Sequence, residues 1–221
     1  DNKAISSADA VAVISPQLES YALSHGAKKT LLYFPPTDFK PVKKTRGKKF
    51  VFGYIGSTDP WQGIDMLFKA FQDLNDSCEL RVYGRMTPAL EAKAGEDYRI
   101  KLFGEIPNSE VPSALASFDV FVLPRPSSPT VETTTPIKLV EAMRAGCAVL
   151  STDVGGASWL LKDGENALVC RPTVKSLRRK MQYALKHRRG LTRLGKNARE
   201  TAGASDYRRV GKTMADFMKR V

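Results

Sequence analysis

Short apolar runs recur at regular intervals between residues 50 and 170, and stretches with helical spacing separate most of them. The clearest helical stretch, residues 63–74, places four apolar side chains on one face, at i, i+3, i+4 and i+7: Ile64, Leu67, Phe68 and Phe71. Strands that alternate with helices predict right-handed crossovers and an α/β, Rossmann-like parallel sheet with helices on both faces. The predicted strands are residues 50–55, 80–83, 100–103, 120–123, 148–150 and 167–169.

The two ends of the chain differ from this central region. Near the start, residues 8–14 and 30–34 predict short strands, and residues 16–25 between them predict a helix. Two short strands and one helix bury little surface alone, so we expect residues 1–40 to need a larger sheet. Residues 173–221 predict helices in two or three pieces, with Gly190 and Gly203 between them.

Composition indicates a soluble globular protein, since 42% of the residues are hydrophobic and 26% are charged. The 35 Lys and Arg residues exceed the 23 Asp and Glu residues, which gives a net charge of +12 and favours phosphate-bearing partners. The two basic clusters, residues 40–49 and 175–193, are typical of a linker and of a solvated helical face. Aromatic residues do not alternate with these cations, so nucleic acid is not the expected partner.

The three cysteines and the absence of long apolar runs indicate in which cellular compartment the protein is expected. Cys78, Cys147 and Cys170 are widely spaced and lack metal-ligand spacing, which predicts buried, reduced thiols in the cytoplasm and no metal site. No apolar run approaches the length of a membrane span. The basic linker and helices allow a peripheral contact with the cytoplasmic face of a membrane.

The best candidate for chemistry is a short helix over residues 135–146. The Thr135 hydroxyl suits the N-cap, Pro136 suits the first helical position and Gly146 suits the end of the helix. Lys138 places a cation at the positive end of the helix dipole, which is favourable if an anion binds the free N–H groups of Ile137 and Lys138. Glu141 follows at i+3. An ordinary amphipathic helix with a surface lysine explains the same residues equally well.

A second candidate is the turn after the first strand of the predicted sheet. Gly56, Ser57, Gln62 and Gly63 lie in a glycine-bearing turn that leads into a helix, where backbone can approach a phosphate or a sugar. The spacing matches neither GxGxxG nor a Walker A loop, and a tight structural turn is the simpler interpretation.

Two arginines also follow predicted strands. Arg85 and Arg125 would lie at the same rim of the sheet, where either guanidinium could pair with a phosphate or remain a solvated surface group.

Taken in order, these pieces resemble the C-terminal, donor-binding domain of retaining glycosyltransferases of the GT-B fold, family four. Residues 8–41 resemble the last strands of the N-terminal domain of that family and its crossing linker. The resemblance divides the chain into a remnant of the N-terminal acceptor domain (1–40), a basic linker (41–49) and a nucleotide-sugar-binding domain with C-terminal helices (50–221). The matching segments of the donor-binding domain are residues 56–71, 80–84, 102–107, 118–124, 135–146 and 153–166.

The resemblance implies roles for particular residues. Glu141 matches the second glutamate of a paired-glutamate motif, which binds the nucleotide ribose. The backbone of residues 135–138 matches the segment that holds the diphosphate and the donor sugar. Ile106 lies in the loop that contacts the base, and Gly56 lies in the loop beside the diphosphate.

This chain also departs from the pattern of the family. Ser57 and Gln62 stand where many members carry arginine and lysine, so we expect Lys138, with Arg85 or Arg125, to replace them. The first glutamate of the pair is replaced by Thr133. Glu132 is one residue away and reaches the site only through a bulge, so no catalytic residue is assigned.

The resemblance implies the donor half of an enzyme that transfers a hexosyl group from a nucleoside diphosphate sugar, UDP- or GDP-linked, with retention and without a cofactor. Such enzymes make polysaccharides or glycoconjugates. Acceptor-side groups would lie outside this chain, which alone would bind the donor weakly. The alternatives are a non-catalytic nucleotide-sugar-binding module, a sugar-nucleotide epimerase of the same fold, and a basic nucleic-acid-binding protein.

Overall fold

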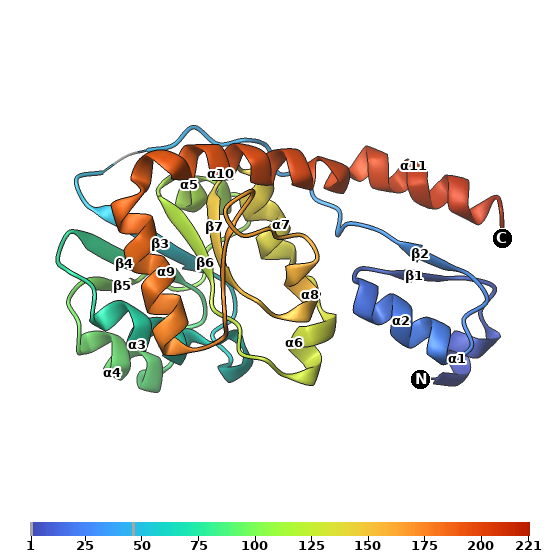
Figure 1. Cartoon of the computed structure of the whole chain (residues 1–221), viewed down its shortest axis with the longest axis horizontal. Helices are drawn as coiled ribbons and strands as arrows, with labels where there is room; N and C mark the ends of the chain where they lie inside the picture. The colour runs from blue at the N-terminus through green and yellow to red at the C-terminus, as the bar shows by residue number, and fades with distance from the viewer. Residues whose placement is uncertain (1, 46) are drawn as a thin grey trace.

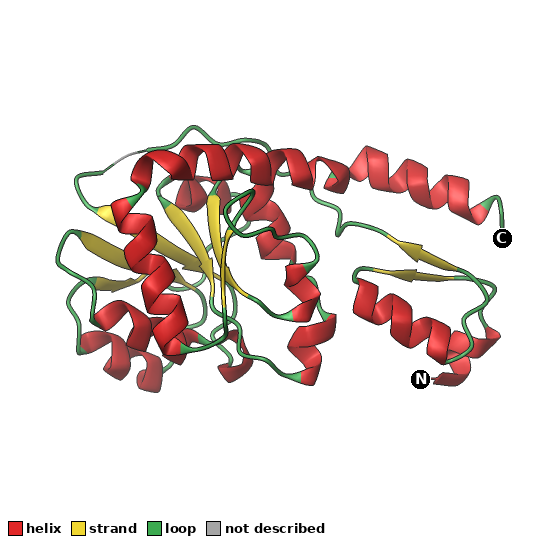
Figure 2. Cartoon of the chain, in the orientation of Figure 1, coloured by secondary structure: helices red, strands yellow, loops and turns green. Residues whose placement is uncertain are grey.

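The computed structural model describes residues 2–45 and 47–221, and its main body is a six-stranded, fully parallel sheet between two layers of helices (Figures 1 and 2). The strand order is β5-β4-β3-β6-β7-β8. This is the predicted α/β fold, a Rossmann-like parallel sheet with helices on both faces. The strands are β3 (Phe50–Ile55), β4 (Cys78–Tyr83), β5 (Ile100–Leu102), β6 (Val120–Leu123), β7 (Ala148–Thr152) and β8 (Leu168–Cys170).

Each face of the sheet has its own apolar core. Every residue of β3, β6 and β7 is buried, as expected for central strands covered on both faces. One core lies under α3 (Ile64–Gln72), α4 (Pro88–Gly95), α9 (Val174–Lys186) and α10 (Arg188–Thr201). The other lies under α5 (Val111–Ala116), α7 (Ile137–Arg144) and α8 (Gly155–Ser158).

The order of the strands defines where a ligand can bind. From β3 the chain moves outward to β4 and β5, then returns to the other side of β3 and continues through β6, β7 and β8. The order in which the chain adds strands to the sheet therefore reverses between β3 and β6. In open parallel sheets the crevice at the carboxyl ends of such strands is the usual ligand site.

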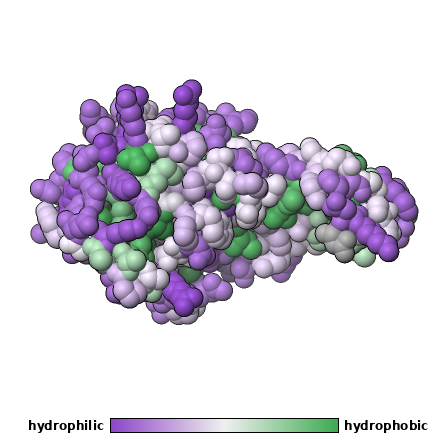
Figure 3. All heavy atoms as spheres, turned by 90° about the horizontal axis from the view of Figure 1, so that it is seen from below, coloured by the Kyte–Doolittle hydropathy of each residue, from purple (hydrophilic) through white to green (hydrophobic). Residues whose placement is uncertain are grey.

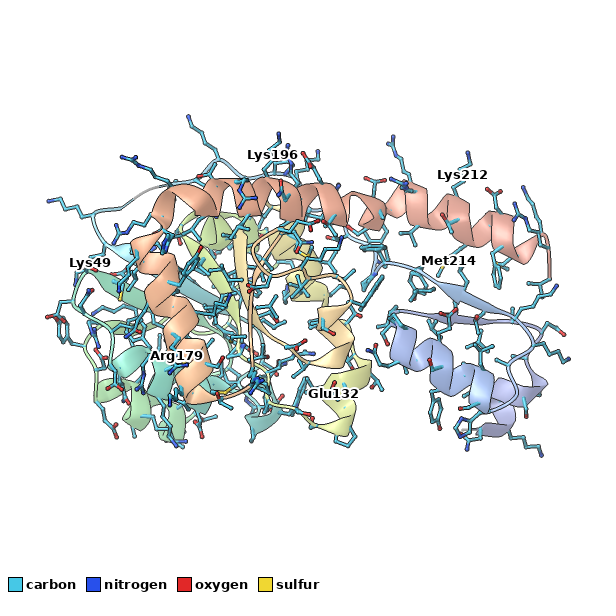
Figure 4. The ribbon with its side chains drawn as sticks, viewed as in Figure 1. Lys49, Glu132, Arg179, Lys196, Lys212 and Met214 are labelled. Atoms are coloured by element: carbon cyan, nitrogen blue, oxygen red, sulfur yellow. The ribbon has the colours of Figure 1, made fainter. Side chains whose placement is uncertain are left out.

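Residues 2–34 form a smaller unit, which we call the N-terminal unit, beside the main body. Its two strands are parallel and three residues long, and α2 covers one side of them while α11 runs along the other (Figure 1). Met214 of α11 points towards these strands (Figure 4) and lines an apolar pocket of about 360 Å³ with Leu31. The elements are α1 (Asn2–Ser7), β1 (Val11–Val13), α2 (Pro16–Ser24), β2 (Thr30–Leu32) and α11 (Tyr207–Met218).

Specific contacts join the N-terminal unit to the main body. Ser15, the N-cap of α2, donates a hydrogen bond from its hydroxyl to the Thr133 carbonyl at 2.7 Å. The Thr135 hydroxyl lies 2.7 Å from the Ile14 carbonyl. Thr133 is the last residue of α6 (Pro129–Thr133), and the segment that follows it leads into α7, so these bonds lie next to the candidate site.

The C-terminal helices differ from their predicted boundaries. The break between α9 and α10 lies at His187, and Gly190 is inside α10, so the boundary predicted there is wrong. Gly203 lies in the 3-10 turn η2 (Ala202–Ser205) between α10 and α11, as expected. None of the described helices is long and apolar enough to cross a membrane.

The three cysteines are free and buried, as predicted. Burial raises the pKa of Cys78 and of Cys170 to about 11, so both thiols stay protonated at neutral pH. The predicted basic linker includes Arg46, which lies outside the described residues.

Candidate functional site

Two adjoining cavities lie at the carboxyl ends of β3 and β4. The first, which we call the α7 cavity, has a volume of about 390 Å³ and is lined by Gly56, Ser57, Ile106 and Lys138 among others. The second, the α4 cavity, has about 520 Å³ and shares Ser57 with the first. Figure 3 views this side of the molecule, where apolar patches lie among hydrophilic residues. Four of the predicted site residues therefore line one cavity, beside the point where the strand order reverses.

Helix α7 begins one residue later than the sequence predicts. Pro136 occupies the N-cap position and its carbonyl accepts the first bond of the helix, at 3.1 Å from the Leu139 nitrogen. Ile137 and Lys138 are the first two helical residues, so their N–H groups have no carbonyl partner within the helix. The two N–H groups that the sequence predicts to bind an anion are therefore free of partners within the helix.

The prediction that the Thr135 hydroxyl caps α7 is wrong. This side chain is buried, with Oγ1 2.7 Å from the Ile14 carbonyl, 2.5 Å from the Gly156 carbonyl and 3.0 Å from Trp159 Nε1. These partners come from two other segments, Ile14 before α2 and the α8 region with Gly156 and Trp159, which local sequence spacing does not reveal. Thr135 positions the start of α7 and does not face the cavity.

Lys138 and Glu141 form a charge pair at the first turn of α7. Lys138 Nζ lies 3.0 Å from Glu141 Oε2, and both side chains are largely covered. That oxygen is buried but makes no hydrogen bond of good geometry. Burying a carboxylate oxygen without a hydrogen-bond donor costs free energy. Glu141 Oε2 can therefore still accept a hydrogen bond, for example from a ligand hydroxyl.

Two predicted site residues, Ser57 and Gln62, stabilise the turn after β3 through side-chain hydrogen bonds. Ser57 Oγ donates to Asp59 Oδ2 at 2.7 Å and accepts a hydrogen bond from Gln62 Nε2 at 3.2 Å. The Tyr54 hydroxyl donates to the Ser57 carbonyl at 2.5 Å, and burial raises the pKa of this tyrosine, which keeps it a donor. Ser57 is thus fixed from three directions where it lines both cavities.

Gly63 serves packing. It has a positive φ of 79°, and a Cβ there would lie 1.8 Å from the Pro124 carbonyl oxygen. This close approach joins the start of α3 to the end of β6. Gly63 lines neither cavity, and its close packing against Pro124 holds the turn after β3 in place.

Arg125 is a buried arginine without a carboxylate partner in the described part of the chain. Its Nε donates to Gln62 Oε1 at 3.1 Å and its Nη1 to the Thr134 carbonyl at 3.3 Å. The guanidinium also lies over the Trp61 ring, with its carbon 5.2 Å from the ring centre. Burial lowers the pKa of Arg125, so an anion nearby would stabilise the charge.

Arg85 and Glu132 lie apart from Lys138. Arg85 is exposed and lines the α4 cavity, and its guanidinium makes no hydrogen bond to any described residue. Glu132, on α6 at the lower edge of Figure 4, accepts bonds from Ser127 Oγ at 2.7 Å and from the Gly155 N–H at 2.5 Å. This carboxylate anchors the start of α8.

Sequence reasoning missed several residues that line the α7 cavity. Glu105 and Asn108 belong to the loop after β5, and Tyr83 ends β4. Tyr83 stacks on Phe103 with ring centres 4.6 Å apart. The only sequence signal for this group is that Tyr83 and Glu105 lie in segments matching the family. Among the described residues, no cluster of His, Cys, Asp or Glu side chains is placed to hold a metal ion.

Comparison with known families decides the classification. Residues 37–201 match the family model of the glycosyl transferases group 1. The chain belongs to this family. A search of curated proteins gave no match.

Solved structures share the fold of this group 1 chain. Sucrose-phosphate synthase from Thermosynechococcus elongatus is 22% identical with a TM-score of 0.86. The Anabaena protein Alr3699/HepE, in complex with UDP and glucose, is 18% identical with a TM-score of 0.84. A glycosyltransferase from Rickettsia africae is 12% identical with a TM-score of 0.82. These matches cover 99%, 97% and 99% of this chain, but the chain spans only 60%, 64% and 66% of theirs.

Proposed function

We propose that this chain is the donor-binding half of a retaining hexosyltransferase that uses a nucleoside diphosphate sugar. The observation that carries the proposal is the start of α7. There, N–H groups without a helical partner lie close to Lys138 and the carboxylate of Glu141. Lys138 lines a cavity beside the point where the strand order reverses. A helix start with a cation suits a diphosphate, and a carboxylate one turn further suits ribose hydroxyls.

The Lys138–Glu141 pair would change its partners on binding. A diphosphate at the start of α7 attracts the ammonium of Lys138, because two phosphate charges compete with one carboxylate. Glu141 is then free to accept hydrogen bonds from the ribose. Neutralising the charge that develops on the leaving diphosphate, together with positioning of the sugar, would supply much of the rate of transfer.

Arg125 contributes to the same site in this proposal. Ser57 and Gln62 carry no charge where many relatives have cations, and Arg125 places a guanidinium directly behind Gln62. Gln62 then connects Arg125 to Ser57 in the cavity wall. A UDP or GDP donor fits these features, and HepE, of the same fold, has been solved with UDP and glucose.

The remaining parts of the proposal concern the whole enzyme. We assign residues 1–40 to the end of an N-terminal acceptor domain, 41–49 to the linker and 50–221 to the donor domain. The acceptor groups then belong to the N-terminal domain, and this chain alone binds donor weakly. The free, buried thiols support a cytoplasmic location in this proposal.

Calorimetric titration with UDP, GDP and ADP, with and without the sugar, tests the proposal. We expect saturable binding of one nucleotide, weakened at least about tenfold by Lys138→Ala or Glu141→Ala. Lys69→Ala, which removes an exposed lysine of α3 without an ion pair, is the control and should bind normally. Unchanged affinity in both site variants would overturn the assignment. If this chain binds no nucleotide, titration of the full-length protein decides between an incomplete site and a wrong one.

A non-catalytic nucleotide-sugar-binding module is the second candidate. It is favoured by Asp59, whose carboxylate lines the α4 cavity beside Ser57, where a cation would serve a diphosphate better. Glu132 is also engaged in structural bonds. Transferase activity of the full-length protein with its acceptor would eliminate this candidate.

A further inference from the structure

The net positive charge of the chain comes entirely from its last 51 residues. Residues 171–221 contain 16 Lys and Arg but only three Asp and Glu, a net charge of +13. The preceding 170 residues contain 19 basic and 20 acidic residues, a net charge of −1. The sheet and its cavities are therefore nearly neutral overall, and the C-terminal helices carry the excess.

Helices α10 and α11 carry half of these cations, and several of them face outward along the two helices. They run end to end along the molecule through η2 (Figure 1), and their apolar sides are buried through Leu191, Leu194 and Val210. The outward side chains are exposed, and Figure 4 shows Lys196 and Lys212 pointing away from the body. We call this surface the basic ridge; it consists of Arg189, Lys196, Arg199, Arg208, Lys212 and Lys219.

The cations of the basic ridge are almost uncompensated. Among the described residues, the one ion pair they make joins Lys196 to Glu200 at 3.9 Å, between two exposed side chains. Helix α9 is different, because Lys180 pairs with Asp163 at 2.6 Å and Arg178 also has a carboxylate partner. The charges of α9 are thus partly used in holding the fold, and those of the ridge are not.

The shape of the ridge indicates what kind of anion it fits. Two helices end to end present cations over about 45 Å, at a rise of about 1.5 Å per residue. The row lies outside both cavities of the candidate site. We propose that the basic ridge binds the surface of a bilayer containing anionic lipids. Clustered cations on a helix are attracted to such a surface within a Debye length.

The neighbouring side chains favour a lipid surface over nucleic acid. Met218, at 74% exposure, and Val221 lie at the end of the ridge beside Lys219, and Tyr207 is exposed at the start of α11. Apolar and amphipathic side chains among cations suit a membrane interface. Single-stranded nucleic acid is usually held by a series of stacking rings. Tyr207 is the only exposed aromatic residue that α10 and α11 provide.

The basic ridge lies at the opposite end of the sheet from the candidate donor site. Gly195 of α10 packs against Gly146 and the start of β7, at the amino ends of the strands. The cavities lie at the carboxyl ends of β3 and β4. A membrane on the ridge therefore leaves the cavities open, and this inference does not depend on the proposed donor binding.

Co-sedimentation of the full chain with vesicles tests the inference. The probe is phosphatidylcholine vesicles with or without about one third phosphatidylglycerol, at about 0.1 M and about 0.5 M salt. We expect binding to the anionic vesicles at low salt only. The variant Lys196→Gln/Lys212→Gln/Lys219→Gln should weaken it by about a hundredfold.

A matched variant distinguishes the ridge from net charge. Lys69→Gln/Lys101→Gln/Lys162→Gln removes the same charge from exposed positions outside α10 and α11 and should lower vesicle affinity far less. All six side chains are exposed, so thermal unfolding should be similar in both variants. Equal losses in the two variants, or no binding to anionic vesicles, overturn the inference. Ridge-dependent binding of duplex DNA or of RNA that is tighter than vesicle binding also overturns it, in favour of nucleic acid.

Discussion

At the scale of single residues, the most informative side chain is Arg125. It is only 4% exposed, yet it has no carboxylate partner among the described residues. Buried arginines are normally paired, and an unpaired one is costly unless an anion arrives. In the proposed donor site, its hydrogen bond to Gln62 would let it replace the cations that the turn after β3 lacks.

Replacing Arg125 should weaken nucleotide binding more than replacing Arg85. Arg125→Met removes a charge held close to the cavity wall, so we expect a loss of about tenfold or more in affinity for the preferred nucleotide, measured by calorimetry. Arg85→Met removes an exposed charge that solvent screens, and it should change affinity by less than about threefold. The reverse order would identify Arg85 as the replacement cation.

Asp97 and Arg99 form a structural clamp that should dominate stability near β5. Arg99 donates to both carboxylate oxygens of Asp97 at 2.9 and 2.6 Å and to the carbonyls of Gln72, Leu74 and Asn75. Asp97→Asn should cost about 3 kcal/mol of unfolding free energy at pH 7, because it leaves the buried guanidinium without its counter-charge. Urea unfolding measures the loss.

The pH dependence of this clamp has a definite sign. The hydrogen bonds from Arg99 lower the pKa of Asp97, so the native state favours its charged form. Its stabilisation is complete above the ordinary pKa of a carboxyl group and disappears as the pH falls through the lowered value. The difference between wild type and Asp97→Asn should therefore shrink in acid. Asp76→Asn, at an exposed partner of Arg99, is the control and should have little effect.

At the scale of elements, α10 contains two glycines in opposite surroundings. A Cβ on Gly195 would lie 2.3 Å from the Gly146 carbonyl oxygen, while a Cβ on Gly190 meets no atom within 4 Å. Gly190→Ala should stabilise the protein by up to about 1 kcal/mol through helix propensity. Gly195→Ala should destabilise it by about 2 kcal/mol or more, because α10 must move away from β7. Thermal unfolding of the two variants checks both signs, and a loss of stability in Gly190→Ala would contradict the packing described.

The same glycines explain which element boundaries the sequence predicts. Gly146 has a φ of 75° and ends α7 as expected, because a left-handed residue is needed there. Gly190 costs α10 up to about 1 kcal/mol in helix propensity, but burial of Leu191 and Leu194 outweighs this cost, so the helix continues through it. The observed break at His187 has no glycine or proline to mark it. Helices α1, α6 and α8 have four to six residues, too few for apolar periodicity to appear.

At the scale of the whole molecule, the N-terminal unit should be less stable than the main body. Strands β1 and β2 pair over three residues each, whereas β3 is paired on both sides. Two-stranded sheets are marginal alone. Hydrogen exchange should therefore be faster in Val11–Val13 and Thr30–Leu32 than in β3 and β6. Equal protection in the two regions would show that the N-terminal unit unfolds only with the main body.

The sheet could be predicted from sequence because its information is local. Buried strands, amphipathic α3 and the alternation between them determine the fold class, and the six predicted strands are all present. The start of α7 could be predicted for the same reason. The roles of Thr135, Gln62 and Arg125 could not, since each depends on partners 21 to 121 residues away. The exact lining of the cavities is likewise a property of the folded chain.

The bonds from Ser15 and Thr135 would link the proposed donor site to any motion of the N-terminal unit against the main body. Rotation of the N-terminal unit away from the main body would break the Ser15–Thr133 and Ile14–Thr135 contacts. Both contacts act on the segment immediately before Lys138, so any such opening would disturb the helix start that would hold a diphosphate. Coupling of this kind is reciprocal. A nucleotide that tightens the start of α7 would therefore also resist opening, and a cross-link that prevents opening would raise nucleotide affinity.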